Sequence, residues 1–321
     1  MKRQRYANID SVSNDKSFSD MRRWMKERKQ KVKDLSVQIP QIDDKQLSYI
    51  QTNRSEQAIT WIGHATFLIQ MGGLNIVTDP VWASRMGFQR RLTDPGISLQ
   101  DMPEIDVVLI SHGHYDHLDI PTLRRLRGRP TYLVPIGLRT LLERKGFQNV
   151  TELSWWEEVH VGSLRFTFVP AQHWTRRSLF DMNTSHWGGW MIEAGAGSSR
   201  HLRFETIYFV GDTGYFRGFQ MIAEKFQVDT ALLPIGAYEP EWFMNVSHMT
   251  PEEAVQAFIE LGAKRFIPMH YGTYRLADDT GPEALVRLTR SWETRCSEGD
   301  GELAVMKLGE TIRLSDDPGL T

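Results

Sequence analysis

Short apolar runs separated by Gly, Pro and Asp dominate the chain from residue 58 onward. The runs 58–62, 66–70 and 74–78 are rich in the β-branched and aromatic residues typical of strands, and Gly72-Gly73 predicts a turn between the last two. Residues 106–111 form a nearly unbroken apolar run, which predicts a fully buried strand. Further strands are expected at 131–135, 156–161, 164–170, 187–193, 206–210, 230–234, 266–269 and 302–308.

Helical segments fall between these runs. The clearest one starts at Thr250, because T-P-E-E places Thr at the N-cap, Pro at the first helical position and Glu253 at the third, which is a capping box. This helix is expected to end at Gly262. Other helices are predicted at 121–126, 137–145 and 282–294. The alternation shows no break between residues 58 and 321, so we expect one mixed α/β domain with its sheets covered by helices.

Residues 1–57 form a separate N-terminal extension. Up to residue 34 it carries 11 Lys and Arg against 5 Asp and Glu. Phe18, Met21, Trp24 and Met25 recur at helical spacing and predict an amphipathic helix over 19–33. Docking of this helix on the main domain is the favoured interpretation. The alternative is peripheral contact with anionic lipid headgroups, to which each nearby basic residue contributes about 1 kcal/mol. Residues 36–56 are polar and predict a linker.

Composition limits the residue types that can bind a metal ion and indicates where in the cell the protein is expected. Cys296 is the only cysteine among 321 residues, so a metal ion must be held by His and carboxylate side chains. No apolar run reaches the roughly 20 residues of a membrane span. The basic N-terminus lacks the apolar stretch of a signal peptide, so we expect a cytoplasmic protein, peripheral at the inner membrane face if it binds lipid. A formal net charge of −2 gives no general argument for nucleic acid, and none is expected as a partner.

The strand at 106–111 is followed at once by a dense group of metal ligands. The segment S-H-G-H-Y-D-H-L-D (111–119) contains His112, His114, Asp116 and His117. Neutral imidazole is the commonest protein ligand for zinc-like ions, and a sharp turn at a strand end can direct such side chains into one pocket. A polar turn with hydrogen-bonded histidines is the alternative, but it explains three His in six residues poorly.

Three later residues complete the candidate centre. His173, Asp212 and His270 each follow a predicted strand, at 164–170, 206–210 and 266–269. A single such residue is usually structural. Three in succession, each after the carboxyl end of a strand, lie where α/β sheets place their ligands.

These residues carry a family resemblance. The H-x-H-x-D-H motif with the three later residues resembles the metallo-β-lactamase superfamily of metal-dependent hydrolases. A closer resemblance is to the family of phospholipases D that hydrolyse N-acylphosphatidylethanolamine (NAPE-PLD) and to its prokaryotic relatives. It rests on the blocks W-I-G-H-A-T (61–66), T-D-P (78–80), S-H-G-H-Y-D-H-L-D (111–119), P-A-Q-H-W (170–174), G-D-T-G-Y (211–215), P-I-G-A-Y-E-P (234–240), W-F-M (242–244) and H-x-x-P-E-E-A (248–254).

The resemblance implies an αββα sandwich over residues 58–321 with two metal ions, zinc or alternatively manganese or a mixed pair, in a cleft at the sheet edges. By this match one metal is bound by His112, His114 and His173, the other by Asp116, His117 and His270, and Asp212 bridges them. Such a pair can hold a hydroxide for attack and bind an anionic phosphoryl oxygen, and Asp116 would orient the hydroxide.

Other residues receive supporting roles. Asp79 and His64 are expected to hold ligands from behind, although a plain buried polar residue explains His64 nearly as well. His248 is expected to protonate the leaving alkoxide, and Tyr115 to hydrogen-bond a phosphoryl oxygen. The family carries Gln where this chain has Ser247. A set of residues near the ligand loops reads equally well as core or as an apolar slot for acyl chains: Trp174, Trp187, Trp242, Phe243 and Met244.

The expected activity is therefore a phosphodiesterase of phospholipase D type acting on a phospholipid-like substrate. A lactonase or other ester hydrolase of the sugar-phosphate lactonase type keeps the same site and is the alternative, and a nuclease is a third option. A non-catalytic scaffold has no physical need for seven metal ligands. A homodimer is among the expected assemblies.

Overall fold

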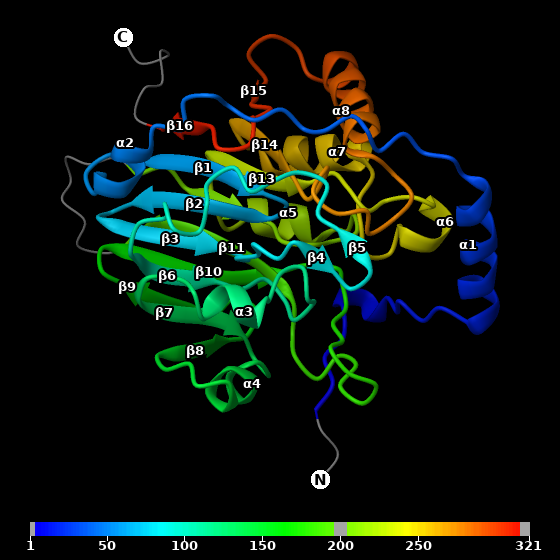
Figure 1. The fold of residues 1–321 in the computed structure, drawn as a ribbon, viewed down its shortest axis with the longest axis horizontal. Coiled ribbons are helices and arrows are strands. Elements are labelled where there is room, and N and C mark those ends of the chain that lie inside the picture. The colour runs from blue at the N-terminus through cyan, green and yellow to red at the C-terminus, as the bar shows by residue number, and fades with distance from the viewer. Residues whose placement is uncertain (1–3, 196–203, 315–321) are drawn as a thin grey trace.

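Two sheets stacked face to face form the centre of the computed structural model, which describes residues 4–195 and 204–314 (Figure 1). The first sheet is antiparallel at one side, from β16 to β3, and parallel from β3 to β8. Its seven strands lie in the order β16 (Thr311–Arg313), β1 (Ala58–Gly63), β2 (Thr66–Met71), β3 (Leu74–Thr78), β6 (Ile105–Leu109), β7 (Gly128–Pro135) and β8 (Val150–Leu153).

The second sheet is antiparallel from β9 to β12 and parallel from β12 to β15. A separate two-stranded hairpin, β4 (Arg85–Met86) with β5 (Gln89–Arg90), projects beside the sandwich (Figure 1). The seven strands of the second sheet lie in the order β15 (Glu302–Leu303), β14 (Arg265–Met269), β13 (Thr230–Pro234), β12 (Ile207–Phe209), β11 (Gly188–Ala194), β10 (Leu164–Pro170) and β9 (Glu158–Val161).

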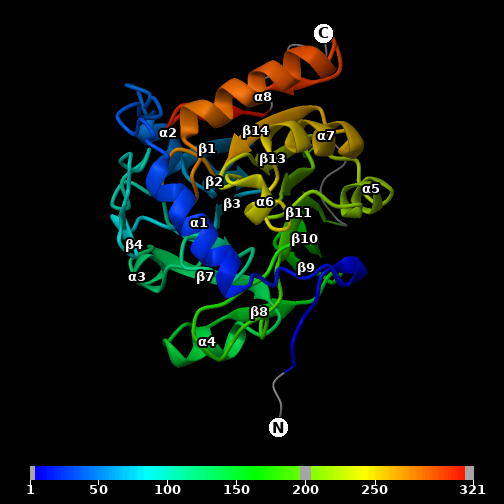
Figure 2. The ribbon, with the colours of Figure 1, turned by 90° about the vertical axis from the view of Figure 1, so that its right-hand side faces the viewer.

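Helices cover the outer faces, which confirms the predicted αββα arrangement (Figures 1 and 2). Within 4–195 and 204–314, no helix is both long enough and apolar enough to cross a bilayer. The helical elements are η1 (Ile9–Ser11), α1 (Phe18–Gln30), α2 (Leu47–Thr52), α3 (Ile120–Leu123), α4 (Arg139–Arg144), α5 (Gly218–Ala223), α6 (Glu241–Met244), α7 (Pro251–Leu261) and α8 (Gly281–Arg295).

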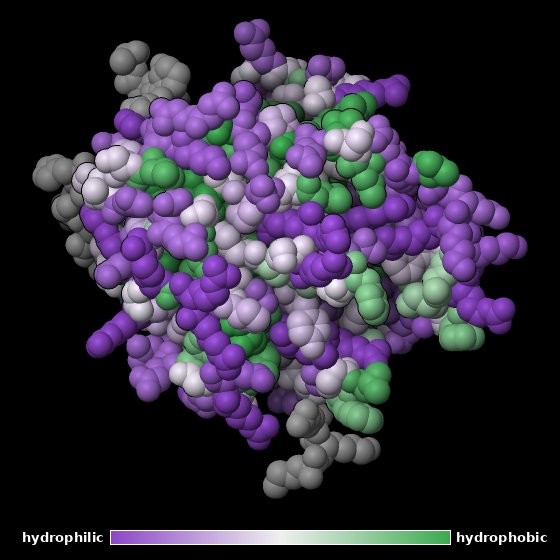
Figure 3. Space-filling model, viewed as in Figure 1, coloured by the Kyte–Doolittle hydropathy of each residue, from purple (hydrophilic) through white to green (hydrophobic). Residues whose placement is uncertain are grey.

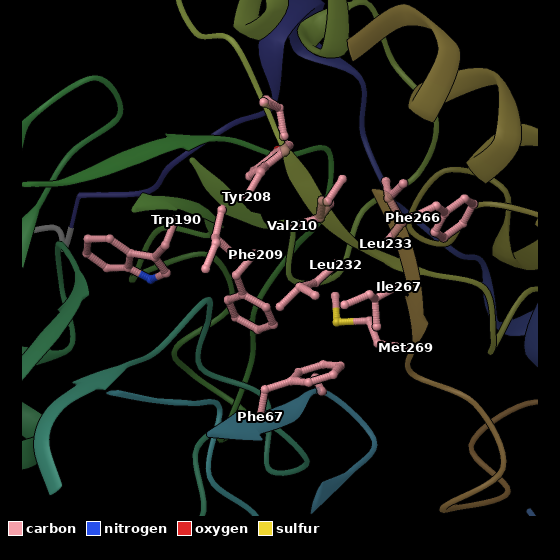
Figure 4. Packing of buried hydrophobic residues seen from close by; sticks show 14 of the residues in the cluster. Phe67, Trp190, Tyr208, Phe209, Val210, Leu232, Leu233, Phe266, Ile267 and Met269 are labelled. Atoms are coloured by element: carbon pink, nitrogen blue, oxygen red, sulfur yellow. The ribbon is translucent and has the colours of Figure 1, made fainter. Parts of the chain in front are cut away.

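Alternation of side chains divides the apolar core into two layers. On β2, Phe67 and Ile69 belong to the cluster between the sheets, whereas Leu68 belongs to the cluster under the helices of the first sheet. This follows from the two-residue period of a strand, which sends successive side chains to opposite faces. Figure 4 shows Phe67 pointing toward Phe209 and Leu232 of the second sheet, so the two sheets share one continuous apolar interior.

Most predicted elements are present, and the capping box at Thr250 is confirmed at the start of α7. The predicted linker at 36–56 is wrong in part, because it contains α2 and its fully buried Ile50. The final strand predicted at 302–308 is much shorter, since only β15 joins a sheet there and Leu308 forms an isolated bridge with Gln41. Sequence patterns missed η1, β4, β5, β8, α5, α6 and β16. These elements are short, and β16 depends on pairing with β1, more than 200 residues away.

The strands that precede the candidate ligands end close to one another. β6 leads into the segment 111–117, β10 into His173, β12 into Asp212 and β14 into His270. The first of these strands belongs to one sheet and the other three to its neighbour. The candidate site therefore lies across one end of the sandwich, where both sheets deliver side chains.

Candidate metal centre

Three imidazoles converge in the first half of the site. His112 Nε2 lies 2.8 Å from His114 Nδ1, and His173 Nε2 lies 3.2 Å from the same nitrogen. The three residues form one of the groups of side chains able to share a metal ion. Two of them follow β6, and the third comes from the loop after β10, so the group joins the two sheets.

Hydrogen bonds on the far side of two of these rings set their orientation. His173 Nδ1 donates to the carbonyl oxygen of Ser247 at 2.9 Å, and His112 Nδ1 lies 2.9 Å from Ser111 Oγ. A ring that donates through Nδ1 presents the lone pair of Nε2, which is the form that binds a metal. The surrounding chain thus holds these rings with Nε2 directed into the group.

The second half of the site combines imidazole and carboxylate groups. His117 Nε2 and His270 Nε2 lie 3.2 Å apart, and Asp116 Oδ2 lies 3.4 Å from the first and 3.5 Å from the second. Asp212 stands between the halves. Its Oδ1 lies 3.1 Å from His270 Nε2, and its Oδ2 lies 3.2 Å from His117 Nε2 and 3.9 Å from His173 Nε2. One carboxylate therefore reaches ligands of both groups.

Asp79 and His64, for which supporting roles were predicted, both contact predicted ligands. The fully buried Asp79 carboxylate accepts hydrogen bonds from His117 Nδ1 at 2.6 Å and from the Ser111 backbone N–H at 2.7 Å. His64 Nε2 donates to Asp116 Oδ2 at 3.0 Å. Asp79 holds His117 from the side that faces away from the neighbouring candidate ligands. His64 instead contacts the Asp116 oxygen that also faces His117 and His270, and it belongs with these three residues to a group of side chains able to share a metal ion.

Left-handed backbone conformations also mark the site. His64 has φ 56° and His270 has φ 61°, values that L residues with a side chain rarely adopt. The two turns are tied together, because the His270 backbone N–H donates to the His64 carbonyl oxygen at 3.1 Å. Each such residue costs on the order of 1 kcal/mol, and such strain is typically retained at functional sites.

Burial keeps the imidazoles of the first group neutral. It lowers the pKa of His112 and His173 well below the usual value and that of His114 to about 4, and neighbouring histidines lower the pKa of His112 and His173 further. Neutral imidazole is the metal-binding form, so these side chains need lose no proton at neutral pH to take up a cation.

The pKa values of the histidines in the second group shift upward instead, because carboxylates surround these side chains. Burial alone would lower the pKa of His117 and His270, but nearby Asp212 and Asp116 outweigh it, raising the first well above its usual value and the second to about 9. In the same way, burial would raise the pKa of Asp116 and Asp212, but His117 and other neighbours bring it well below the ordinary value. Without a metal, protonated imidazoles supply the positive charge that these carboxylates require.

The donor set fits divalent metal ions. Zinc bound tetrahedrally at about 2.0–2.1 Å places its ligand nitrogens roughly 3.3 Å apart. The nitrogen separations of 2.8 and 3.2 Å in the first group and 3.2 Å in the second are close to that spacing. Asp212 Oδ1 is buried and lies 3.1 Å from His270 Nε2 without forming a well-aligned hydrogen bond to any described residue, and a cation would satisfy it. Five imidazoles and two carboxylates thus form a cluster that could hold metal.

A cavity of about 980 Å³ opens above this cluster and has a largely apolar wall. Three of the five residues expected near the ligand loops line it: Trp174, Phe243 and Met244. Trp187 does not, because it is buried in the core, and Trp242 instead donates through Nε1 to Glu27 at 3.1 Å.

The N-terminal segment supplies parts of the site that sequence reasoning missed. Met21 and Trp24 of α1 line the cavity, and Trp24 stacks on Phe243 with ring centroids 4.9 Å apart. Asn8 Oδ1 accepts a hydrogen bond from the His173 backbone N–H at 2.9 Å. The spacing of apolar residues in α1 was a signal for docking but did not identify the surface that it covers.

Two of the predicted catalytic side chains, His248 and Tyr115, lie at the cavity. His248 lines the cavity with Nδ1 3.9 Å from Asp212 Oδ2, but burial lowers its pKa to about 4, so it is neutral and a weak proton donor at pH 7. The Tyr115 hydroxyl donates to the Arg177 carbonyl oxygen at 2.9 Å at the rim, and its hydrogen bond to a phosphoryl oxygen stays a prediction.

Comparison with known proteins places this arrangement in a family. The model of the beta-lactamase superfamily domain matches residues 74–271. The chain is 37% identical over 277 residues to N-acyl-phosphatidylethanolamine-hydrolyzing phospholipase D 1 of Caenorhabditis elegans, covering 80% of this chain and 76% of that protein. It is 32% identical over 248 residues to the mitochondrial N-acyl-phosphatidylethanolamine-hydrolyzing phospholipase D of Saccharomyces cerevisiae, covering 73% of this chain and 52% of the yeast protein.

Solved structures share the fold at lower sequence identity. A possible metal-dependent hydrolase of Veillonella parvula superposes with a TM-score of 0.64 at 18% identity, covering 81% of this chain and all of that one. Igni18, a metallo hydrolase of Ignicoccus hospitalis, gives a TM-score of 0.59 at 24% identity, covering 80% and 98% of the two chains. The sandwich, the His and Asp cluster and these relatives lead to one conclusion: the chain belongs to the metallo-β-lactamase superfamily of metal-dependent hydrolases, in which it is similar to the phospholipases D that hydrolyse N-acylphosphatidylethanolamine.

Proposed function

We propose that this hydrolase is a two-zinc phosphodiesterase that cleaves a phospholipid-like substrate at the bond that a phospholipase D cleaves. The main support for this proposal is the position of the largely apolar cavity directly over the His and Asp cluster. An anionic phosphodiester suits the cluster when it holds cations, and acyl chains suit the wall formed by Met21, Trp24 and Phe243. The similarity to phospholipases D supports this choice.

Seven residues would hold the two ions. His112, His114 and His173 form one set, Asp116, His117 and His270 the other, and Asp212 would bridge them. When bound, two such ions supply Lewis acidity and lower the pKa of a coordinated water to about 7.

The chain's own residues then hold the reacting groups in place. His64 keeps Asp116 oriented through the 3.0 Å hydrogen bond, and Asp79 does the same for His117. His248 stands at the cavity wall as a neutral imidazole. We assign it a hydrogen bond to a substrate oxygen, which replaces the proton transfer expected from the sequence. Positioned donors of this kind stabilise charge that develops on oxygen.

A panel of three substrates tests the proposed reaction. The metal-loaded protein should hydrolyse N-acylphosphatidylethanolamine and, more slowly, an aryl phosphodiester, and should leave an acyl lactone intact. Turnover is followed by release of phosphatidic acid, of the aryl alcohol and of the hydroxy acid. Hydrolysis of the lactone alone would replace the phospholipase proposal with the lactonase alternative, which uses the same metal centre.

Asp212→Asn tests the bridging position. The neutral amide removes a negative charge shared by both groups, so the variant should lose metal and at least a hundredfold in kcat/KM, since metal ions contribute several kcal/mol to such reactions. Metal content per protein and turnover of the aryl phosphodiester are measured together. Asp43→Asn, at an exposed position, is the matched control and should behave as wild type. Full occupancy and full turnover in the Asp212 variant would refute the assignment.

Metal binding should release protons at neutral pH. In the metal-free protein the pKa of His270 is about 9, so its imidazole is protonated at pH 7.5 and must lose that proton to bind a cation. Apparent zinc affinity should therefore increase as the pH rises toward 9 and level off above it. Titration calorimetry in two buffers of different ionisation enthalpy measures the protons released. Zero release at pH 7.5 would show that His270 is already neutral.

His248→Ala separates the two roles considered for His248. A lost hydrogen bond to a charged oxygen should lower kcat by roughly 10- to 100-fold for both the phospholipid and the aryl phosphodiester. Loss of a proton donor would affect the phospholipid alone, because an aryl oxide leaves without protonation. Comparison of the two kcat ratios decides between them, with His160→Ala, at an exposed position, as the control.

A further inference from the structure

Two imidazole nitrogens of neighbouring rings at the candidate metal centre have no access to solvent. Hydrophilic residues, in purple, dominate the face drawn in Figure 3, where water can satisfy their polar atoms. His64 Nδ1 and His270 Nδ1, in contrast, are buried and have no hydrogen-bond partner among the described residues. A buried polar atom without a partner is costly, so each of these nitrogens requires an explanation.

The ring of His270 lacks the support that other predicted ligands receive. In His117 the nitrogen that faces away from the centre donates to Asp79, and in His173 it donates to the Ser247 carbonyl oxygen. Metal-binding imidazoles almost always have such a partner, which fixes the ring and leaves the other nitrogen free for the metal. His270 presents Nε2 to His117 at 3.2 Å, so its Nδ1 is the nitrogen that requires a partner.

A small cavity of about 10 Å³ lies beside both unpartnered rings. His64, His270 and the half-buried Asp279 form part of its wall. The two rings lie against each other with their centroids 4.0 Å apart, so one small molecule in the cavity is placed to contact both. A space of this size suits a single water, and a buried water needs two to four polar partners.

The hydrogen-bonding groups around this cavity complement one another. His64 donates through Nε2 to Asp116 at 3.0 Å, so the Nδ1 of its neutral ring is an acceptor. His270 Nδ1 is a donor whenever Nε2 of the same ring binds a cation. A water that accepts from His270 and donates its two hydrogens to His64 and Asp279 satisfies all three groups.

The Asp279 carboxylate is held in place and can still accept a further hydrogen bond. Its Oδ2 accepts from the Ala237 backbone N–H at 2.9 Å, and its Oδ1 accepts from the Glu239 backbone N–H at 3.2 Å. A carboxylate offers about four lone-pair positions, so these two bonds do not exhaust it. The same loop packs on the turn that carries His270, since a Cβ atom at Gly236 would lie 2.1 Å from the His270 carbonyl oxygen.

We propose that one ordered water occupies this cavity and joins His270 Nδ1, His64 Nδ1 and the Asp279 carboxylate, which makes Asp279 a positioning residue for the metal ligand His270. The arrangement resembles the direct hydrogen bond between His117 and Asp79, with a water placed between ring and carboxylate. The inference rests on the metal groups of the proposed function but on neither its substrate nor its reaction.

A high-resolution crystal structure of the zinc-loaded protein tests the water directly. Ordered density should lie about 2.7–3.2 Å from His270 Nδ1, from His64 Nδ1 and from a carboxylate oxygen of Asp279. A cavity without density, or density that contacts neither ring, would overturn the proposal.

Two variants test the positioning role through zinc affinity. Ala277→Val adds two carbons to the cavity wall and should expel the water, and Asp279→Asn replaces its carboxylate partner by an amide. Both should weaken the binding of one zinc ion roughly 10- to 100-fold and leave the other nearly unchanged, because His270 belongs to only one of the two metal groups. Competition with a chelator measures the two affinities.

Matched controls separate this effect from general damage to the fold. Glu152→Gln alters a carboxylate that also accepts two backbone N–H groups, from Gly137 at 2.8 Å and from Arg139 at 2.6 Å, in the edge strand β8. Ala304→Val adds the same two carbons in the segment after β15. Both controls should bind two zinc ions as tightly as wild type does.

The pattern of affinities decides whether Asp279 positions His270. If Asp279 only held its loop, Asp279→Asn would lower the melting temperature without weakening one zinc ion selectively. Wild-type affinity for both ions in the Ala277 and Asp279 variants would likewise refute the positioning role.

Turnover measurements distinguish this proposal from the proposed function. A wild-type protein that holds the water and two zinc ions but hydrolyses no phosphodiester would refute the proposed reaction and leave the positioning role intact. Hydrolysis of phosphodiesters by a zinc-loaded protein without the water would refute the positioning role alone.

Discussion

Charge compensation between buried imidazoles and carboxylates is the interaction on which the rest of this structure depends. At the end of the two sheets, Asp212, His117 and His270 are almost completely withdrawn from water, and Asp116 keeps only 13% of its side chain exposed. Each of the two carboxylates lies 3.1–3.5 Å from both imidazoles. Each carboxylate raises the pKa of its neighbouring imidazoles, and each imidazole lowers the pKa of its neighbouring carboxylates, against the effect of burial. Such a cluster stays folded only with compensating positive charge, which protons provide in one state and divalent ions in the other.

Sequence reasoning found most of the centre because its ligands carry local signals. Four of them fall within six residues, and the others follow apolar strands whose ends are readable from the pattern. Asp79 and His64 were recognised only through the family resemblance, and their hydrogen bonds now give them a physical role. The two-sheet sandwich was also expected from the resemblance. Its pairing of β16 with β1 was not, because three residues far along the chain carry no periodic signal.

The roles that depend on burial and on distant contacts could not be predicted. A sequence gives no account of how deeply His248 is buried, and it is the burial that makes its imidazole neutral. Tyr115 lies between two ligands in the sequence, yet its hydroxyl bonds the backbone of Arg177, 62 residues later. The contribution of Trp24 to the cavity wall likewise requires its contact with Phe243, which lies more than 200 residues away. The helical spacing of apolar residues predicted the helix α1 but not the residues that this helix contacts.

The hydrogen bond from the His173 backbone to Asn8 has a consequence for how this hydrolase can diversify. Residues of the N-terminal extension, which precedes the first strand of the sandwich at Ala58, fix the loop that carries His173 through Asn8 and line the cavity through Trp24. Changes in this leading segment can therefore reshape the accepted substrate while every metal ligand stays the same. In this chain, the leading segment can therefore alter substrate selection without altering the residues that would carry out the chemical step.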